Sequence, residues 1–409
     1  MNYILFDDSA RNQLLPLTFT RPVAEIRIGI MTIREKWEKF LACGTSTLTE
    51  PYLANKYPIE KGEINTLINA SIIPNPELVK MIKKLKPNQS IISGETILAY
   101  QISGDDFLNL DEVSFDDTSE ESDEKPIEEE LIEFSGEYTK INNPWDIFTF
   151  NEQEIVADYK LLTKGRKSQK LSSTNLLIGD EKNLFIEEGA VIEGATINVN
   201  DGPVYVAENT EIMEGCLIRG AFALCSHAQL KMGAKIYGGT TIGPYSKIGG
   251  ELNNVVIFGY SNKAHDGFFG NSVIGEWCNI GADSNTSNLK NTYDSVRIWS
   301  YASQTFINTN LQFCGTIMGD HVKCGINTMF NTGTMIGVCA NIFGSGYQRN
   351  FIPSFAWGGT AGLATYSSSK AIEVAKRVWE RRGIEFTKYD EKILNSIFKN
   401  THHNRKLKF

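Results

Sequence analysis

The chain has 409 residues and a formal net charge of −9. This is about two to four times the length of a typical domain, so we expect at least two folding units. Hydrophobic residues make up 41% of the chain and aromatic residues 11%, which excludes global disorder. No run of about 18 apolar residues occurs and no basic segment precedes an apolar one at the start, so we expect neither a membrane span nor a secretory signal. Seven cysteines without a CxxC pair indicate neither a disulfide framework nor a metal site, and we expect a cytoplasmic protein.

The first part of the chain alternates strand-like and helix-like segments. Residues 3–6 and 66–69 are short apolar runs that predict strands, and residues 32–41 and 76–85 have helical spacing. Pro76 would occupy the first turn of the second helix, where proline is well tolerated. This alternation predicts a small Rossmann-like α/β domain with a mostly parallel sheet.

Most of the negative charge lies in one segment. Between Asp111 and Glu130 the sequence has eleven carboxylates and one base, Lys125, which together give −10. The rest of the chain therefore sums to about +1. We expect a solvated external or mobile loop at 110–131, and no basic stripe elsewhere suggests a nucleic-acid partner.

The strongest pattern is a run of aliphatic residues spaced by six. A period of six fits neither an α-helix nor a strand followed by a hairpin, but it fits a parallel β-helix, in which each hexad is one short strand and a turn. We expect these side chains to line one interior corner of the β-helix. They are Val206, Ile212, Ile218, Leu224, Leu230, Ile236, Ile242 and Ile248.

After about residue 345 the hexads give way to an aromatic, glycine-rich stretch and two helical segments, which we expect to cap the β-helix. The sequence thus predicts four regions. They are an α/β domain over 1–155, a linker over 156–171, a β-helix over 172–350 and a C-terminal stretch with helices over 351–409.

The segment Lys263–Asn288, KAHDGFFGNSVIGEWCNIGADSNTSN, resembles the acetyltransferase region of bifunctional sugar-1-phosphate nucleotidyltransferase/acetyltransferases of the GlmU type. That family has a lysine–histidine loop interrupting the hexads, then Ile-Gly, Asn-Ile-Gly-Ala and a further asparagine. The resemblance implies a left-handed β-helix, a homotrimer, acetyl-CoA as co-substrate and a role in UDP-N-acetylglucosamine biosynthesis.

The resemblance also implies roles for individual residues. His265 would be the general base, because an amino-sugar ammonium must lose a proton before its nitrogen attacks a thioester, and an imidazole suits that task at neutral pH. Asn288 would contact the acceptor, and Lys263 or Lys247 would neutralise its phosphate. Asn253 stands where the family has an acceptor-binding lysine.

The N-terminal part resembles the nucleotidyltransferase half of the same proteins. The matching segments are Leu14–Gly44, with its Pro-Leu-Thr, and Ile141–Ile155, with its Pro-Trp-Asp. The resemblance implies binding of UTP or dTTP with Mg²⁺ and transfer to a sugar-1-phosphate. The residues that we expect nearest the nucleotide are Leu5, Asp7, Arg11 and Arg21.

Some positions depart from the family pattern, and they leave alternatives open. The glycine-rich first turn is replaced by Asp7-Asp-Ser-Ala-Arg11, and Phe268 and Gly249 replace a tyrosine and an arginine of the acceptor site. One alternative is therefore a catalytically degenerate trimer that binds sugar nucleotides or only scaffolds. A zinc hydro-lyase on a β-helix is a further alternative, but His227, His265 and His321 lack the expected spacing.

Overall fold

The computed structural model describes residues 2–104, 107 and 130–406, so most of the acidic segment lies outside the described residues. The chain forms two compact units that interleave in sequence. The first comprises Met1–Arg11, Pro22–Glu25 and Ile33–Ile141, and the second comprises Asn12–Arg21, Ile26–Thr32 and Asn142–Phe409.

The first unit is built on a six-stranded mixed sheet with the order β4-β1-β5-β7-β6-β8. Strands β4, β1 and β5 are parallel, whereas β7 runs antiparallel to both β5 and β6. The predicted helices form α2 and α4, and Asn75 caps α4 by accepting a hydrogen bond from the Leu78 amide at 2.9 Å. The elements are β1 (Asn2–Phe6), α1 (Ala10–Gln13), α2 (Ile33–Leu41), β4 (Ser46–Leu48), α3 (Pro51–Ala54), β5 (Ile64–Asn69), α4 (Pro76–Ile82), β6 (Gln89–Ser93), β7 (Thr96–Ser103) and β8 (Glu130–Glu133).

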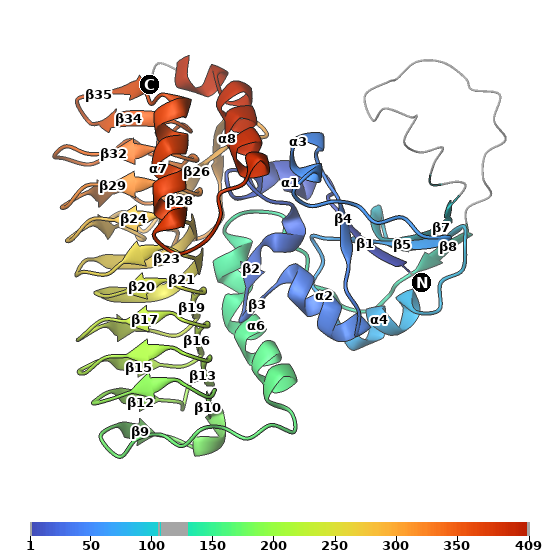
Figure 1. The fold of residues 1–409 in the computed structure, drawn as a ribbon, viewed down its shortest axis with the longest axis horizontal. Coiled ribbons are helices and arrows are strands. Elements are labelled where there is room, and N and C mark those ends of the chain that lie inside the picture. The colour runs from blue at the N-terminus through green and yellow to red at the C-terminus, as the bar shows by residue number, and fades with distance from the viewer. Residues whose placement is uncertain (1, 105–106, 108–129, 407–409) are drawn as a thin grey trace. The chain divides into compact units, whose positions relative to one another are not determined.

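The second unit is the parallel β-helix that the sequence predicts, and its short strands stack along one axis (Figure 1). Its strands form three faces, which we call A, B and C. Face A has β10 (Leu184–Ile186), β13 (Val204–Val206), β16 (Phe222–Leu224), β19 (Thr240–Ile242), the ends of β21 (Glu251–Gly259) and β23 (Phe268–Glu276), β28 (Ile317–Met318), β31 (Met335–Ile336) and β33 (Phe351–Ile352).

Faces B and C complete each coil. Face B has β11 (Val191–Ile192), β14 (Glu211–Ile212), β17 (Gln229–Leu230), β20 (Lys247–Ile248), β22 (Asn262–Lys263), β24 (Asn279–Ile280), β29 (Lys323–Cys324), β32 (Asn341–Ile342), β34 (Ala356–Gly359) and β35 (Gly362–Thr365). Face C has β9 (Leu176–Ile178), β12 (Thr196–Asn198), β15 (Leu217–Arg219), β18 (Lys235–Ile236), the starts of β21 and β23, β25 (Asn285–Thr286) and β30 (Met329–Phe330).

The period-six aliphatic residues are all buried in one core inside these coils, which confirms the hexad pattern. They do not line one corner, however. Because a regular coil contains three hexads, every third member of the run is stacked on the same ladder, as the pairing of Val206 with Leu224 and of Leu224 with Ile242 shows. The run is therefore distributed over three ladders, one on each face.

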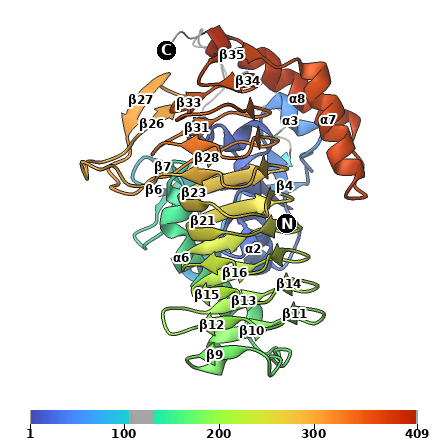
Figure 2. The ribbon, with the colours of Figure 1, turned by 90° about the vertical axis from the view of Figure 1, so that its left-hand side faces the viewer.

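Coil length changes where the resemblance predicts an interrupting loop. Ile257 pairs with Ile242, and Ile274 in turn pairs with Ile257. Both of these coils are shorter than a regular coil of three hexads, so no loop leaves the stack at residue 263. The insertion comes after Asn288, since Ile274 next pairs with Met318, and it contains the hairpin β26 (Arg297–Ser300) and β27 (Thr305–Asn308), visible beside the stack in Figure 2.

The coils continue past residue 350, because β33 and β34 still pair in parallel with the preceding coil. Two helices follow, α7 (Ser368–Glu380) and α8 (Lys388–Asn400), and Thr387 and Asp390 form a capping box at the start of α8. None of the helices in the described part of the chain has both the length and the apolar character of a bilayer-spanning segment.

Helix α6 (Asp146–Thr163) and the hairpin β2 (Arg27–Ile28) and β3 (Met31–Thr32) belong to the second unit. They pack an apolar surface, including Ile30 and Ile155, against face A. The turn needs Gly29, which has a φ of +72°, and a Cβ there would lie 2.5 Å from a carboxylate oxygen of Asp158.

Candidate functional site

His265 lies on the corner between faces B and C of the β-helix, and its side chain is exposed. It follows strand β22, just after Asn262 and Lys263. An exposed imidazole on a corner of the prism is accessible to a ligand from solvent, which is what a general base requires.

Lys263 does not belong to an acceptor site, contrary to the sequence-based expectation. It occupies an interior position beside Ile248, is only 2% exposed, and donates hydrogen bonds to the carbonyl oxygens of Gly249, His265 and Asp266 at 3.2, 2.6 and 3.2 Å. Burial lowers the pKa of this amine to about 8, with Asp266 opposing the shift. An ammonium group held inside the coil in this way is out of reach of a phosphate.

Lys247 lies on face B in a group of four basic side chains that we call the cationic cluster, namely Lys231, Lys247, Arg381 and Arg382. On the strand ladder Lys247 is flanked by Gln229 and Asn262. Lys231 Nζ donates to Gln229 Oε1 at 2.9 Å, and Arg382 Nη2 donates to Asn262 Oδ1 at 3.1 Å. Neighbouring strands thus bring the two lysines together, and Arg382 reaches them from the end of α7.

The electrostatics of the cationic cluster are those of an anion site. The pKa of Lys247 is lowered by burial and by Arg382, Lys231 and Arg381, while Glu211 partly opposes the shift. In the described residues, no carboxylate lies within 4 Å of any of the four basic groups. Grouped like charges that Glu211 offsets only in part cost folding energy, and such an arrangement is typical of a functional site.

Stacked rings fix the position of Arg381 and Arg382. Along the corner between faces A and B, Tyr260 stacks on Trp277 at 4.3 Å between ring centroids, and Trp379 of α7 stacks on Trp277 at 4.6 Å. The two arginines come shortly after Trp379 in the chain, so this stack holds them near Asn262. The sequence analysis missed both, because only the packing of α7 brings them to face B.

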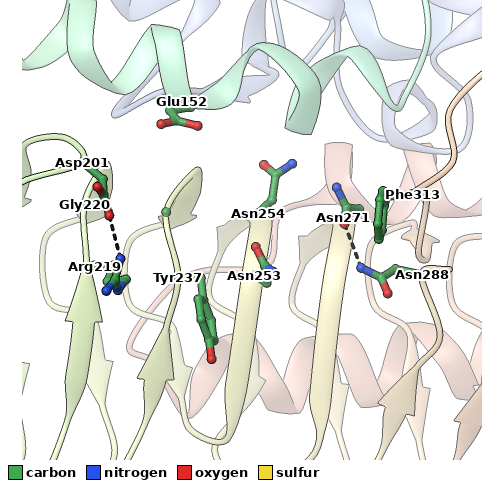
Figure 3. A pocket seen from close by; sticks show the side chains of 11 residues that line it. Glu152, Asp201, Arg219, Gly220, Tyr237, Asn253, Asn254, Asn271, Asn288 and Phe313 are labelled. Carbon is green, nitrogen blue, oxygen red and sulfur yellow. Dashed lines mark hydrogen bonds and ion pairs between the residues drawn. The ribbon is translucent and has the colours of Figure 1, made fainter.

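Asn253 and Asn288 are brought together, but away from His265, at the corner between faces C and A. They line a groove of about 500 Å³, whose wall also includes Glu152, Tyr237, Asn254 and Asn271 (Figure 3). Asn288 Nδ2 donates to Asn271 Oδ1 at 2.8 Å. We call this the amide groove, and within one chain it is separate from the corner that carries His265.

In the first unit, the predicted turn after β1 is occupied by its own ion pairs. Asp7 accepts hydrogen bonds from the Val23 amide at 2.8 Å and the Thr49 hydroxyl at 2.5 Å and is paired with Arg11 Nε at 3.3 Å. Burial raises the pKa of Asp7, and these three partners oppose the shift. Arg11 also donates to the Tyr52 hydroxyl at 2.8 Å.

Asp8 is likewise neutralised inside the first unit. Lys140 Nζ lies 2.9 Å from its carboxylate, and Asn69 Nδ2 and the Ser71 hydroxyl donate to it at 3.0 and 3.3 Å. These groups meet at the carboxyl ends of β1 and β5, where the strand order reverses around β1. Ligands of open α/β sheets bind at such a switch point. Lys140 was not singled out in the sequence, because it lies far along the chain from Asp8.

Two of the expected nucleotide-binding residues are not part of this edge. Leu5 is completely buried, and it lies in β1, an interior strand of the sheet that is flanked by β4 and β5. Arg21 belongs to the second unit, where it forms a buried ion pair with Asp320 and lies 3.3 Å from Glu276. Within the first unit the structure therefore does not bring these two residues together with Asp7 and Arg11, and the acidic partner of Arg21 is too distant in the sequence for its pattern to reveal.

A bound Mg²⁺ does not fit the residues of the first turn. The carboxylates of Asp7 and Asp8 are occupied by Arg11 and Lys140, and the described residues contain no group of three or more side chains that could hold a metal ion. Metal sites need carboxylate oxygens that are free to coordinate. We therefore derive no step through a protein-bound metal.

The first unit is a mixed α/β sheet with a polar cluster at its switch point, and the second unit is a parallel β-helix with an exposed corner histidine. The comparisons report what each part is similar to. Residues 3–167 match a family model described as sugar nucleotidyl transferase.

The chain is similar to bifunctional nucleotidyltransferase/acetyltransferases of the GlmU type. It is 28% identical over 208 residues to the "Bifunctional protein GlmU" of Methanococcus aeolicus, which covers 50% of this chain and 43% of that protein. It is 26% identical over 277 residues to the "Bifunctional sugar-1-phosphate nucleotidylyltransferase/acetyltransferase" of Sulfurisphaera tokodaii, covering 65% and 61%. The chain thus spans about half the length of the curated relatives it matches.

Solved structures with some likeness include the polySia specific acetyltransferase NeuO, with a TM-score of 0.27, 16% identity and coverage of 51% of this chain and 94% of that one. A UDP-N-acetylglucosamine acyltransferase from Campylobacter jejuni has a TM-score of 0.24 and 10% identity, with coverage of 55% and 95%. The fold assignment rests on the strand register.

Proposed function

We propose that the protein is a sugar-phosphate transferase with two activities. The β-helix transfers an acetyl group from acetyl-CoA to the amine of an amino-sugar phosphate. The first unit transfers a nucleotidyl group from UTP or dTTP to a sugar-1-phosphate. Relatives named for both activities support this pairing, and these substrates are cytoplasmic metabolites, which favours a cytoplasmic location.

The observation that carries the acetyl transfer is that His265 comes three positions after Asn262, which binds Arg382 of the cationic cluster. Three residues of extended chain span at most about 11 Å, so the Cα atoms of His265 and Asn262 lie within that distance of each other. A phosphate held by Lys247 and Arg382 places the amine of the same sugar near His265. The binding site thus requires both a phosphate and an amine on one small acceptor.

The proposed reaction at His265 is simple acyl transfer. The imidazole removes a proton from the acceptor ammonium, and the free amine attacks the thioester carbonyl of acetyl-CoA. The carbon–sulfur bond breaks as the carbon–nitrogen bond forms, the coenzyme leaves as a thiolate, and the second proton that the nitrogen must lose to become an amide passes to that thiolate. Lys247 and its neighbours hold the phosphate, and they take no part in the proton transfer.

Thiol release from acetyl-CoA with glucosamine-1-phosphate tests this proposal. We expect His265→Ala to lower kcat about 10²–10⁴-fold, the usual loss for a general base. Lys247→Ala should raise KM for the acceptor without a comparable change in kcat, since it only binds the phosphate. The matched control is His402→Ala, an exposed histidine after α8. Equal turnover by wild type and His265→Ala would show that His265 is not the base.

For the first unit, the support is the cluster of Arg11 and Lys140 at the switch point of the sheet. Both cations are paired with carboxylates, so nucleotide phosphates must compete with Asp7 and Asp8 for them. Mg²⁺ would arrive bound to the triphosphate rather than at a protein site. Asp8→Asn should therefore bind UTP or dTTP several-fold more tightly than wild type.

Calorimetric titration tests whether Asp8 competes with the nucleotide. Wild type and Asp8→Asn are each titrated with UTP and with dTTP, in the presence of Mg²⁺. Tighter binding by the variant supports the competition. Weaker binding would mean that Asp8 itself holds the metal ion. If neither protein binds either nucleotide, the first unit is not a transferase, and the degenerate alternative applies to this half of the chain. Lys86→Ala is a suitable control, because this lysine is exposed on the same unit.

We also propose a homotrimer. Face C exposes apolar side chains on its first coils, where Leu176, Ile178 and Leu217 are 57%, 38% and 52% exposed. Leu176 and Leu217 flank Thr196 on one ladder, and we call these exposed side chains of face C the apolar strip. A strip of this kind is typical of a surface that is covered by another subunit.

A further inference from the structure

The amide groove holds a regular column of asparagines. Asn254, Asn271 and Asn288 occupy the corner between faces C and A in successive coils. Asn288 donates to Asn271, and the Asn254 amide, turned so that it donates to the Phe148 carbonyl oxygen at 2.8 Å, accepts from Asn271 at 3.1 Å. These three amides bond to one another and hold neighbouring coils together.

Other polar groups of the groove are not used in this way. The side chains of Glu152, Tyr237 and Asn253 are exposed and make no hydrogen bond to any described residue. Figure 3 shows Glu152 on α6, opposite Asn253 on β21 and Tyr237, which directly follows β18. Donors and acceptors thus line the groove along the strands and on the helix side.

The charge of the groove excludes an anionic ligand. Glu152 and Asp201 contribute two carboxylates, and Arg219 is the single basic residue among the lining residues. Arg219 is already paired with Asp201 at 2.8 Å. The net charge of −1 repels phosphate, so the groove differs in chemistry from the cationic cluster, which attracts it.

The groove is long and repeats along its length. Successive coils contribute Asp201, Gly220, Gly238, Asn254, Asn271 and Asn288. At about 4.8 Å between neighbouring strands, five steps give a length of about 24 Å. The volume of about 500 Å³ lies within the range of about 300–1,000 Å³ that is usual for ligand sites.

From these features we propose that the amide groove binds a neutral oligosaccharide. Amides and the Tyr237 hydroxyl can each donate and accept, and so match a ligand made of hydroxyl groups. The exposed rings of Tyr237 and Phe313, at 42% and 43%, offer apolar faces to sugar rings. A ligand that repeats in steps similar to the coil spacing suits a groove in which each coil supplies one polar position.

The test is calorimetric titration of the full-length protein with maltohexaose, cellohexaose, chitohexaose and mannohexaose. We expect at least one of them to bind, and its monosaccharide unit to bind at least tenfold more weakly. Tyr237→Ala and Asn253→Ala should each weaken binding at least tenfold. Tyr389→Ala, which removes an equally exposed tyrosine from α8, should leave the affinity within twofold.

Three results would overturn the proposal. They are no binding of any neutral hexasaccharide, binding that neither variant weakens, and stronger binding of an anionic hexamer of sialic acid. Thermal melting of each variant checks that it is folded. Tyr237→Ala should retain acetyl transfer at the His265 corner, so failure of this proposal is distinguishable from failure of the proposed function.

Discussion

Replacing Lys263 by methionine should change how the stability of the β-helix depends on pH. The lysine fills an interior position of face B, and its pKa in the folded protein is about 8 rather than 10.5. Below pH 8 the amine is protonated in both the folded and the unfolded chain. Between pH 8 and 10.5 only the unfolded chain retains the proton, so the wild type gains stability as the pH rises.

The difference between the pKa of Lys263 in the unfolded chain, 10.5, and in the folded protein, about 8, corresponds to about 3 kcal/mol of folding free energy, at about 1.36 kcal/mol per pKa unit. About 2–3 kcal/mol of this should appear between pH 7 and pH 10 as a change in the free energy of unfolding of wild type relative to Lys263→Met. Comparison of the two proteins cancels the titration of all other groups. The assay is urea unfolding followed by tryptophan fluorescence, with exposed Lys235→Met as the control. A difference that does not vary with pH would refute the burial of this charge.

Three further changes test other features of the second unit. Asp320→Asn leaves the buried guanidinium of Arg21 without its main partner and should lower the free energy of unfolding by about 3–5 kcal/mol, as measured by urea denaturation. Leu217→Asp places a charge in the apolar strip of face C and should convert the proposed trimer to monomers in sedimentation at micromolar concentration. Trp379→Ala removes the stack on Trp277 and should speed amide hydrogen exchange throughout α7, while exchange in the β-helix core stays slow.

The sequence predicted the β-helix well because its core imposes a period. A coil that repeats must place an aliphatic side chain inward at each strand, and Val206 to Ile248 obey this without exception. Coil length is not fixed by the same rule. The two shorter coils that follow still place Ile257 and Ile274 in the core. The spacing between aliphatic residues therefore changes there, while these side chains stay buried.

Lys263 is a residue for which the six-residue pattern gives the wrong side-chain direction. A lysine in a hexad predicts an outward side chain, yet three backbone carbonyls satisfy this ammonium inside the coil. Nothing in the local pattern indicates that these carbonyls converge. The resemblance offered Lys263 or Lys247 for the acceptor phosphate, and of these two only Lys247 is accessible from solvent.

The candidate sites were predicted only in part, since their members come from distant segments. His265 and Lys247 were identified from local motifs. The arginines of the cationic cluster reach face B through a helix that begins at Ser368, and Lys140 reaches Asp8 across the first unit. Residues that meet only through tertiary packing have no fixed separation in the sequence, so a motif cannot reveal them.

The anchoring of Arg21 by Asp320 bears on the order in which the protein folds during synthesis. The two residues are 299 positions apart. At about 5–20 residues per second, a ribosome needs on the order of 15–60 s to reach Asp320 after Arg21 has been made. Thr20 also donates a hydrogen bond to Asp320, at 2.7 Å, and this bond can form only after the same interval.

During that interval the segment 12–21 lacks its binding partner, because the coil of the β-helix that contains Asp320 has not yet been synthesised. The first unit, in contrast, is complete in sequence once Ile141 has been made. Its strands can pair while this segment stays open as an unfilled loop between Arg11 and Pro22. Segment 12–21 can therefore complete its folding only after the coil that carries Asp320 has been made, long after the sequence of the first unit is complete.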